Sequence, residues 1–76
     1  MNWFAEQRML WIAETLLIFG FINRDHLRRK FYISVPKASQ DLAEFRRRYP
    51  QLMTYDMSTK RYVRADRVRR AKETRR

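Results

Sequence analysis

The chain has little of what small domains normally use for covalent or metal support. Its 76 residues include no cysteine and one histidine. Disulfide frameworks and Cys/His metal clusters are therefore excluded, and we expect no cofactor. A domain of this length buries a smaller fraction of its surface than a larger one does, so self-association is a reasonable source of further buried surface.

Catalytic motifs are missing as well. A single glycine leaves no glycine-rich loop that could hold phosphate groups. No nucleophile lies at a suggestive spacing from a base and an orienting group, and no carboxylate cluster stands ready for a metal ion. His26 is alone among charged residues, and we interpret it as a solvent-facing side chain. The sequence therefore predicts a protein that is not an enzyme.

Long hydrophobic runs are absent too. The most apolar stretch, residues 9–22, is interrupted by Glu14, Thr15 and Gly20, and it falls short of the roughly 18 residues that indicate a membrane span. No small-residue cleavage signature follows it, so we expect neither a membrane anchor nor a secretory signal. These expectations place the protein in the cytoplasm.

What the sequence has in excess is positive charge. The net charge is +10, and 45% of the residues are hydrophobic, which is too many for a disordered chain. Such a field favours a polyanionic partner: DNA, RNA or an anionic membrane surface. Residues 64–76 carry seven Lys/Arg against two acidic residues and so supply half of the net charge. We predict a single domain over residues 1–63, followed by a basic arm that is helical when supported.

A first helix is predicted over residues 2–19, a stretch without proline or glycine that Asn2 can cap and Gly20 can end. Its sequence has two apolar stripes when it is drawn at helical spacing. The broader stripe, which we expect to face the core, contains Ala5, Met9, Leu10, Ile12, Ala13, Leu16 and Leu17. The narrower stripe contains Phe4, Trp11 and Ile18.

Two further helices and a hairpin follow. Asn23 can cap a second helix that ends at Phe31, and Ser34 can cap a third helix over residues 35–49. Strands are predicted over residues 52–55 and 60–63, and residues 21–22 are predicted to form a short extended link. Helix, short turn, helix and hairpin, in this order, predict a mainly α domain with a small β-hairpin, a winged helix-turn-helix.

The exposed stripe of the third helix is small and polar, which suits the major groove of DNA. Glutamine can pair bidentately with adenine and lysine with guanine, whereas bulky side chains would block close approach. The plain alternative is a solvated face, which any amphipathic helix has. The candidate base contacts are Pro36, Lys37, Ser39, Gln40 and Ala43.

Candidate phosphate contacts surround this stripe. Arginines at the end of the third helix also have a plain explanation, because cations interact favourably with the negative end of a helix. Lys60 and Arg61 lie beside the hairpin turn, where a wing would touch the DNA backbone. The candidate set is Ser34, Arg46, Arg47, Lys60, Arg61, Arg64, Arg67, Arg69 and Arg70.

A helix that is apolar on two sides usually needs two partners. Three explanations of the narrower stripe of the first helix remain open: packing under the C-terminal segment, a homodimer interface, or contact with a foreign protein. Its seven-residue spacing forms a nearly straight seam that suits a two-fold dimer. Such a dimer would present two recognition helices to half-sites about 34 to 36 Å apart. The candidate dimer interface is Phe4, Trp11 and Ile18.

Two separated segments resemble a known family. They are residues 33–42, ISVPKASQDL, and residues 55–63, YDMSTKRYV, with INRDHL at residues 22–27 in addition. Over about residues 8–63 the chain is similar to the N-terminal winged helix-turn-helix domain of the WYL-domain transcriptional repressors that govern bacterial anti-phage defence operons. The resemblance implies operator binding as a dimer, with the third helix in the major groove and the hairpin as the wing. Those repressors continue into a ligand-sensing WYL domain, whereas this chain has an arginine-rich tail, so we predict no small-molecule ligand.

The leading hypothesis is a stand-alone transcriptional repressor, of phage or mobile-element origin, that binds an inverted repeat of double-stranded DNA as a homodimer. A second DNA role is an excisionase-like architectural factor, which would bind direct repeats and bend the site. A hypothesis from another class is a phage or mobile-element protein that inhibits a host defence protein by direct binding through the aromatic stripe.

Overall fold

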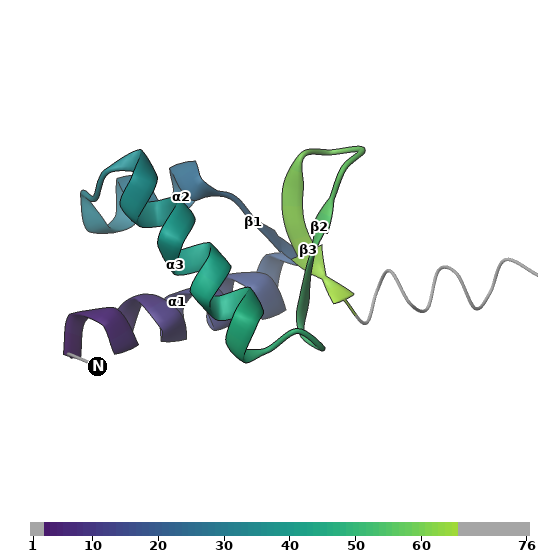
Figure 1. Ribbon diagram of the computed structural model, residues 1–76, viewed down its shortest axis with the longest axis horizontal. Coiled ribbons are helices and arrows are strands. Elements are labelled where there is room, and N and C mark those ends of the chain that lie inside the picture. Colours follow the sequence, from purple (N-terminus) through teal and green to yellow (C-terminus); the bar gives the residue numbers. More distant parts are fainter. Residues whose placement is uncertain (1–2, 66–76) are drawn as a thin grey trace, which may run out of the picture.

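The computed structural model describes residues 3–65, which form three helices and a small antiparallel sheet (Figure 1). The elements are α1 (Trp3–Phe19), β1 (Phe21–Ile22), α2 (Arg24–Phe31), α3 (Val35–Arg48), β2 (Met53–Asp56) and β3 (Arg61–Arg64). Their order is that of a winged helix-turn-helix, as predicted. Within residues 3–65 there is no helix with the length and apolar character that crossing a membrane requires.

The sheet contains one strand more than the predicted hairpin. Gly20 ends α1 with a φ of 82°, in the left-handed region that favours glycine. The next two residues, predicted as a link, form β1, which pairs with β3 so that Ile22 lies opposite Tyr62. The strand order is therefore β1-β3-β2. Two residues are too few to show a strand pattern in sequence, so only tertiary contact reveals this pairing.

Side-chain caps set the starts of α2 and α3. The backbone N–H of His26 donates to Asn23 Oδ1 at 3.1 Å, and the backbone N–H of Asn23 donates to His26 Nδ1 at 3.3 Å. This reciprocal capping box leaves His26 half-buried, so its interpretation as a solvent-facing side chain was wrong in part. At the start of α3 the backbone N–H of Lys37 donates to Ser34 Oγ at 3.2 Å. Both helices thus begin after the predicted caps.

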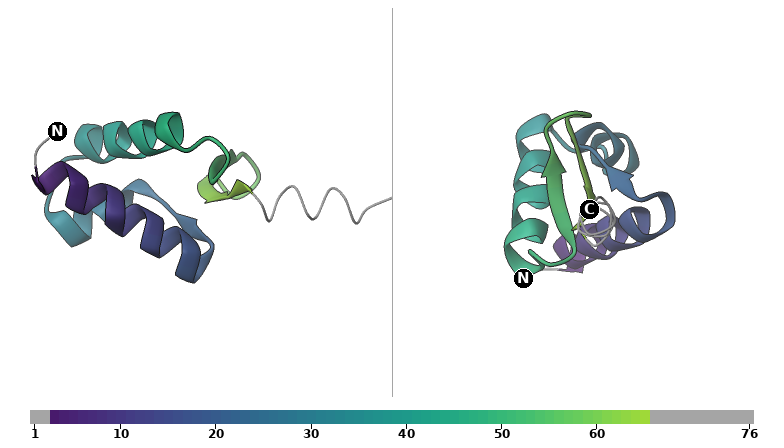
Figure 2. Two further views of the ribbon diagram at one scale, coloured as in Figure 1. Left: turned by 90° about the horizontal axis from the view of Figure 1, so that it is seen from below. Right: turned by 90° about the vertical axis from the view of Figure 1, so that its right-hand side faces the viewer.

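The core lies where the three helices meet the sheet. In Figure 2, α3 occupies one layer and α1 the other, with the hairpin at one end. The largest fully buried side chains come from the three helices and from β1 and β2, and are Phe45, Ile12, Ile22, Leu27, Leu42 and Met53.

The buried face of α1 differs from the one predicted. Leu10 and Leu17 were expected in the core, but they are 55% and 60% exposed. The helix is turned so that Arg8 points inward, where its Nε donates to Asp41 Oδ2 of α3 at 2.6 Å. The prediction located the core face from apolar residues alone, and it was wrong because the polar residue Arg8 also faces inward. The buried residues of α1 are Met9, Ile12, Thr15 and Leu16.

The domain continues past residue 63, where we predicted it to end. Arg64 belongs to β3, and its backbone N–H donates to the Gly20 carbonyl at 3.3 Å. The backbone N–H of Ala65 donates to the Leu52 carbonyl at 3.0 Å, and Ala65 is buried. The first two residues of the predicted arm are therefore part of the folded domain. The rest of the arm, with its predicted helix, lies outside the described residues.

Candidate nucleic-acid interface

The residues predicted to read bases share one face of α3. Pro36, Lys37, Gln40 and Ala43 are exposed, and Ser39 is half-buried. The opposite face of the helix packs into the core through Ala38, Asp41, Leu42 and Phe45. The exposed side chains around Gln40 are short or flexible, so the edge of a base pair can approach this helix closely.

Ser34 and the arginines at the end of α3 differ in what they contact. Ser34 is exposed and its oxygen caps the helix, while its hydroxyl group also has a proton to donate. The guanidinium of Arg47 donates to both carboxylate oxygens of Glu44, at 2.8 and 2.6 Å. Arg48 is half-buried and pairs with Glu44 and with Glu6 of α1, so it ties α3 to α1.

These arginines keep Glu44 ionised. Hydrogen bonding from Arg47, with a further contribution from Arg48, lowers the pKa of the Glu44 carboxyl from 4.5 to about 2. The same hydrogen bond raises the pKa of the Arg47 guanidinium. The negative charge of Glu44 therefore offsets part of the positive charge of Arg47 beside the exposed face of α3.

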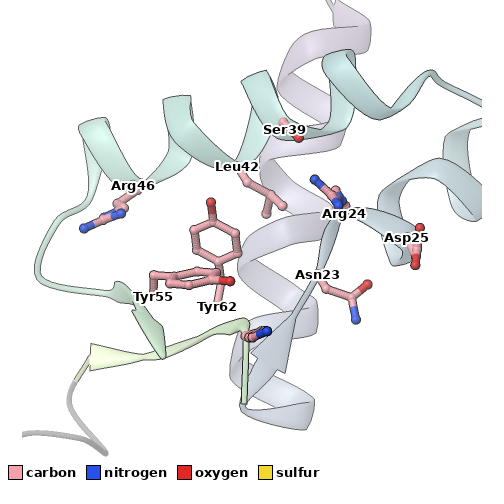
Figure 3. A pocket seen from close by; sticks show the side chains of 9 residues that line it. Asn23, Arg24, Asp25, Ser39, Leu42, Arg46, Tyr55 and Tyr62 are labelled. Carbon is pink, nitrogen blue, oxygen red and sulfur yellow. The ribbon is translucent and has the colours of Figure 1, made fainter. Parts of the chain in front are cut away.

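A cleft of about 580 Å³ separates α3 from the sheet (Figure 3). It collects three cations from three elements: Arg24 of α2, Arg46 of α3, and Lys60 of the hairpin turn. The phenol rings of Tyr55 and Tyr62, cross-strand partners whose centroids lie 5.0 Å apart, occupy its floor beside the sheet. The other lining residues are Asn23, Asp25, Ser39 and Leu42.

The chemistry of this cleft suits a phosphodiester. The positive end of α2 opens at it, and Asp25 on its lining is paired with Arg28 at 3.0 Å. Guanidinium, ammonium and phenol groups all donate hydrogen bonds to anionic oxygens. Within residues 3–65 no group of three metal-binding side chains comes together. The arrangement therefore favours an anionic polymer that runs between α3 and the hairpin.

Arg24, Tyr55 and Tyr62 can donate hydrogen bonds in this cleft, and the sequence analysis did not predict them as site residues. A signal was present for Arg24, because a cation in the first turn of a helix opposes the helix dipole and so invites another explanation. The tyrosines carried no such signal. Their common direction depends on the register in which Tyr55 lies opposite Tyr62.

Hydrogen bonds to Asp56 stabilise the hairpin turn that carries Lys60. Asp56 accepts hydrogen bonds from the Ser58 backbone N–H and the Thr59 hydroxyl, both at 2.9 Å. The Thr59 hydroxyl, and then the Ser58 N–H, lower the pKa of Asp56. Lys60 adopts a φ of 56°, and its exposed side chain lies at the cleft, as expected of a wing residue.

The remaining predicted phosphate contacts are less accessible or lie outside the described part of the chain. Arg61 is half-buried, and its guanidinium carbon lies 4.1 Å from the centroid of the Phe21 ring, in a cation–π contact. Arg64 is half-buried in β3. The structure does not describe Arg67, Arg69 and Arg70.

The predicted dimer stripe on α1 is divided between two environments. Phe4 and Ile18 are 68% and 70% exposed. Trp11 is half-buried, and its ring packs edge-on against Phe31 with centroids 5.6 Å apart. Trp11 therefore contributes to the packing between α1 and α2 within the domain. Further exposed apolar side chains on α1 are Trp3, Leu10, Leu17 and Phe19.

Comparison with known proteins agrees with this architecture. Residues 5–72 match the family described as BrxR transcriptional regulator winged helix-turn-helix domain. Curated relatives from Escherichia coli (strain KTE188) and Escherichia coli, each described as DNA-binding transcriptional repressor CapW, are 43% identical over 61 residues. The match covers 80% of this chain but only 20% of each relative, so the chain spans about a fifth of their length.

The resemblance to the winged helix-turn-helix domains of transcriptional repressors is thus confirmed. The extent of the match, together with the helix order and the three-stranded sheet, leads to one conclusion. The chain belongs to the winged helix-turn-helix domain family of BrxR transcriptional regulators, a non-enzymatic family.

Proposed function

We propose that this chain binds double-stranded DNA in a sequence-specific manner and represses transcription, with α3 in the major groove. The observation that carries this proposal is the exposed face of α3, small and polar, beside a cleft with cations from three elements. Gln40 and Lys37 can read adenine and guanine edges, and Ser39 the neighbouring position. The relatives described as DNA-binding transcriptional repressors support the same function.

The cleft between α3 and the hairpin takes one strand of the DNA backbone. A helix in the major groove has a sugar–phosphate strand on each side, and the cleft lies on the side toward the wing. Arg24, Arg46 and Lys60 neutralise phosphates there, while the phenols of Tyr55 and Tyr62 donate hydrogen bonds. These contacts fix the orientation of α3 without reading bases.

A homodimer on an inverted repeat completes the proposal. The outward face of α1 exposes Phe4 and Ile18 together with Trp3, Leu10 and Leu17. Large apolar side chains exposed in this number on one helix are unusual in a monomeric protein and are typical of an interaction surface. A second copy presents the same surface and can cover it in an isologous interface. The site of action is then the bacterial cytoplasm, on the nucleoid.

Salt dependence tests the backbone contacts. Each neutralised phosphate should contribute about −0.9 to the slope of log affinity against log salt concentration. Deleting residues 66–76, which include six Lys/Arg, should weaken binding to every duplex and flatten this slope while preserving the preferred motif. A truncation that changed the motif and left the slope unaltered would show that the arm reads bases. Absence of any salt-dependent duplex binding by the full chain would contradict the proposed function.

Footprinting on a selected site tests the assembly. Protection with two-fold symmetry, with half-sites about 34 to 36 Å apart, is expected of a dimeric repressor. Protection of direct repeats with a bent duplex would instead indicate an architectural factor. A stoichiometric protein partner recovered from nuclease-treated lysate, without duplex binding by the purified chain, would favour inhibition of another protein.

A further inference from the structure

One buried carboxylate connects the core of the domain to the exposed face of α3. Asp41 is 4% exposed and lies one helical turn after Lys37. Arg8 of α1 donates from Nε to Asp41 Oδ2 at 2.6 Å and from Nη2 to Oδ1 at 3.4 Å. On its other side, Oδ1 lies 3.8 Å from the ammonium nitrogen of Lys37, whose side chain is 45% exposed. Arg8 and Lys37 thus share a single carboxylate.

A contribution to stability is a weak explanation for the buried carboxylate of Asp41. A buried ion pair usually contributes little to stability, because desolvation offsets the attraction between its members. Its geometric effect is clear, however. The Lys37 backbone is held by Ser34 Oγ, and its ammonium lies beside Asp41. A lysine side chain has four flexible carbon atoms, so without this contact its charge would sample many positions.

We propose that Asp41 is a positioning residue that sets where the Lys37 ammonium meets a base pair, and that Arg8 limits the hold of Asp41 on Lys37. This inference rests on the proposed function, because it assumes that α3 enters the major groove. Arg8 neutralises most of the carboxylate charge, and the remainder restrains Lys37 without withdrawing it from DNA. Asp41, and Arg8 through its contact with Asp41, therefore act on specificity while touching no DNA.

Substitutions of the two partners should move non-specific affinity in opposite directions. In Asp41→Asn the ammonium of Lys37 is released, so affinity for random duplex should rise by about threefold. In Arg8→Gln the full charge of Asp41 draws Lys37 inward, and the same affinity should fall by about threefold. Both variants should lose about tenfold in preference at the base pair that Lys37 reads, with the preference at the Gln40 position preserved.

A double variant separates positioning from stability. Either single substitution leaves a buried group without its charged partner and lowers the melting temperature. Arg8→Gln with Asp41→Asn restores a neutral pair of amides, which should recover much of the melting temperature while Lys37 stays released. Glu44→Gln is the matched control, because it removes a half-buried carboxylate that pairs with Arg47 and Arg48 on the same helix, and it should leave the preference at the Lys37 position intact.

The test is selection of bound duplexes by each variant, with melting temperature and random-duplex affinity measured in parallel. We expect the double variant to keep the relaxed preference of Asp41→Asn despite its recovered stability. If the preference returned with stability, or if both single variants weakened random-duplex binding in proportion to their loss of stability, Asp41 would be structural only. The variant Lys37→Ala tests separately whether Lys37 reads a base pair at all. An unaltered motif in that variant would contradict base reading by Lys37 itself, and the inference with it.

Discussion

Two solvent-exposed faces of this small domain have opposite chemistry. The exposed face of α3 is made of short polar and aliphatic side chains around Gln40, with cations at its edges. The outward face of α1 carries large apolar side chains, among them Phe4, Leu10 and Ile18. The α3 face is stable in water as it stands, whereas the α1 face exposes apolar surface that association would bury. This contrast supports the two proposals made above, a polyanionic partner for the α3 face and a second copy of the chain for the α1 face.

A substitution in the core that both helices share should disrupt both faces at once. Phe45 of α3 is 1% exposed and packs in one cluster with Ile12 of α1. Phe45→Ala should lower the free energy of unfolding by about 3 to 5 kcal/mol, which is enough to unfold a domain of this size. Urea denaturation followed by circular dichroism measures the effect. Gln40→Ala, an exposed change on the same helix, is the control and should leave stability almost unaltered.

Charged substitutions on the outward face of α1 should have the next largest effect, which is on the oligomeric state. Leu10→Glu or Ile18→Glu would place a charge in the proposed interface without touching the core, so the dimer should dissociate while the fold persists. Trp11→Glu is the weaker test, because Trp11 packs on Phe31 and the change would also destabilise the domain. Sedimentation and binding to full and half operators are the measurements. Met57→Glu, a change of the same kind at a 78% exposed residue of the hairpin turn, should sediment as the wild type does.

A wild-type protein that sediments as a monomer at concentrations where it binds its operator would contradict the dimer. The apolar face of α1 would then be left for the C-terminal segment of the same chain or for a foreign partner. This outcome would leave the DNA-binding role of α3 untouched.

A substitution of Glu44 tests the charge at the α3 face, and its expected effect is smaller than those above. Glu44→Gln would release Arg47, so affinity for every duplex should rise by about threefold with no change of motif. The pKa of Glu44 is about 2, below its ordinary value of 4.5. Its contacts therefore stabilise the fold above pH 4.5, and this contribution is lost as the pH falls through about 2. Unfolding measured between pH 2 and 5 should show an acid-dependent component that the variant lacks. A pH dependence shared by both proteins would contradict this role.

Local signals predicted much of this fold because caps and breaks act over a few residues. Asn23, Ser34 and Gly20 mark helix boundaries that the structure places where they were expected. The pairing of β1 with β3 was beyond reach, since a two-residue strand has no periodicity. The orientation of α1 was also mispredicted, because the polar residue Arg8 belongs to its buried side.

The candidate base contacts were derived from α3 alone and need nothing beyond helical spacing. They do share one face, on which Ser39 is half-buried and the others are exposed. The cleft was not predictable in this way. Arg24, Arg46 and Lys60 come from three elements, and only their packing brings them together. The contact between Arg8 and Asp41 joins residues 33 positions apart and had no sequence signal either.

Selection of bound duplexes from a random library tests DNA reading by α3 most directly. We expect the wild-type chain to select one motif, and Gln40→Ala to relax a single base pair per half-site at a cost of roughly 1 to 3 kcal/mol. Arg47→Ala, the matched change on the same face, should lower affinity for all sequences and keep the motif. If Gln40→Ala selected the unaltered motif, α3 would not lie in the major groove as proposed.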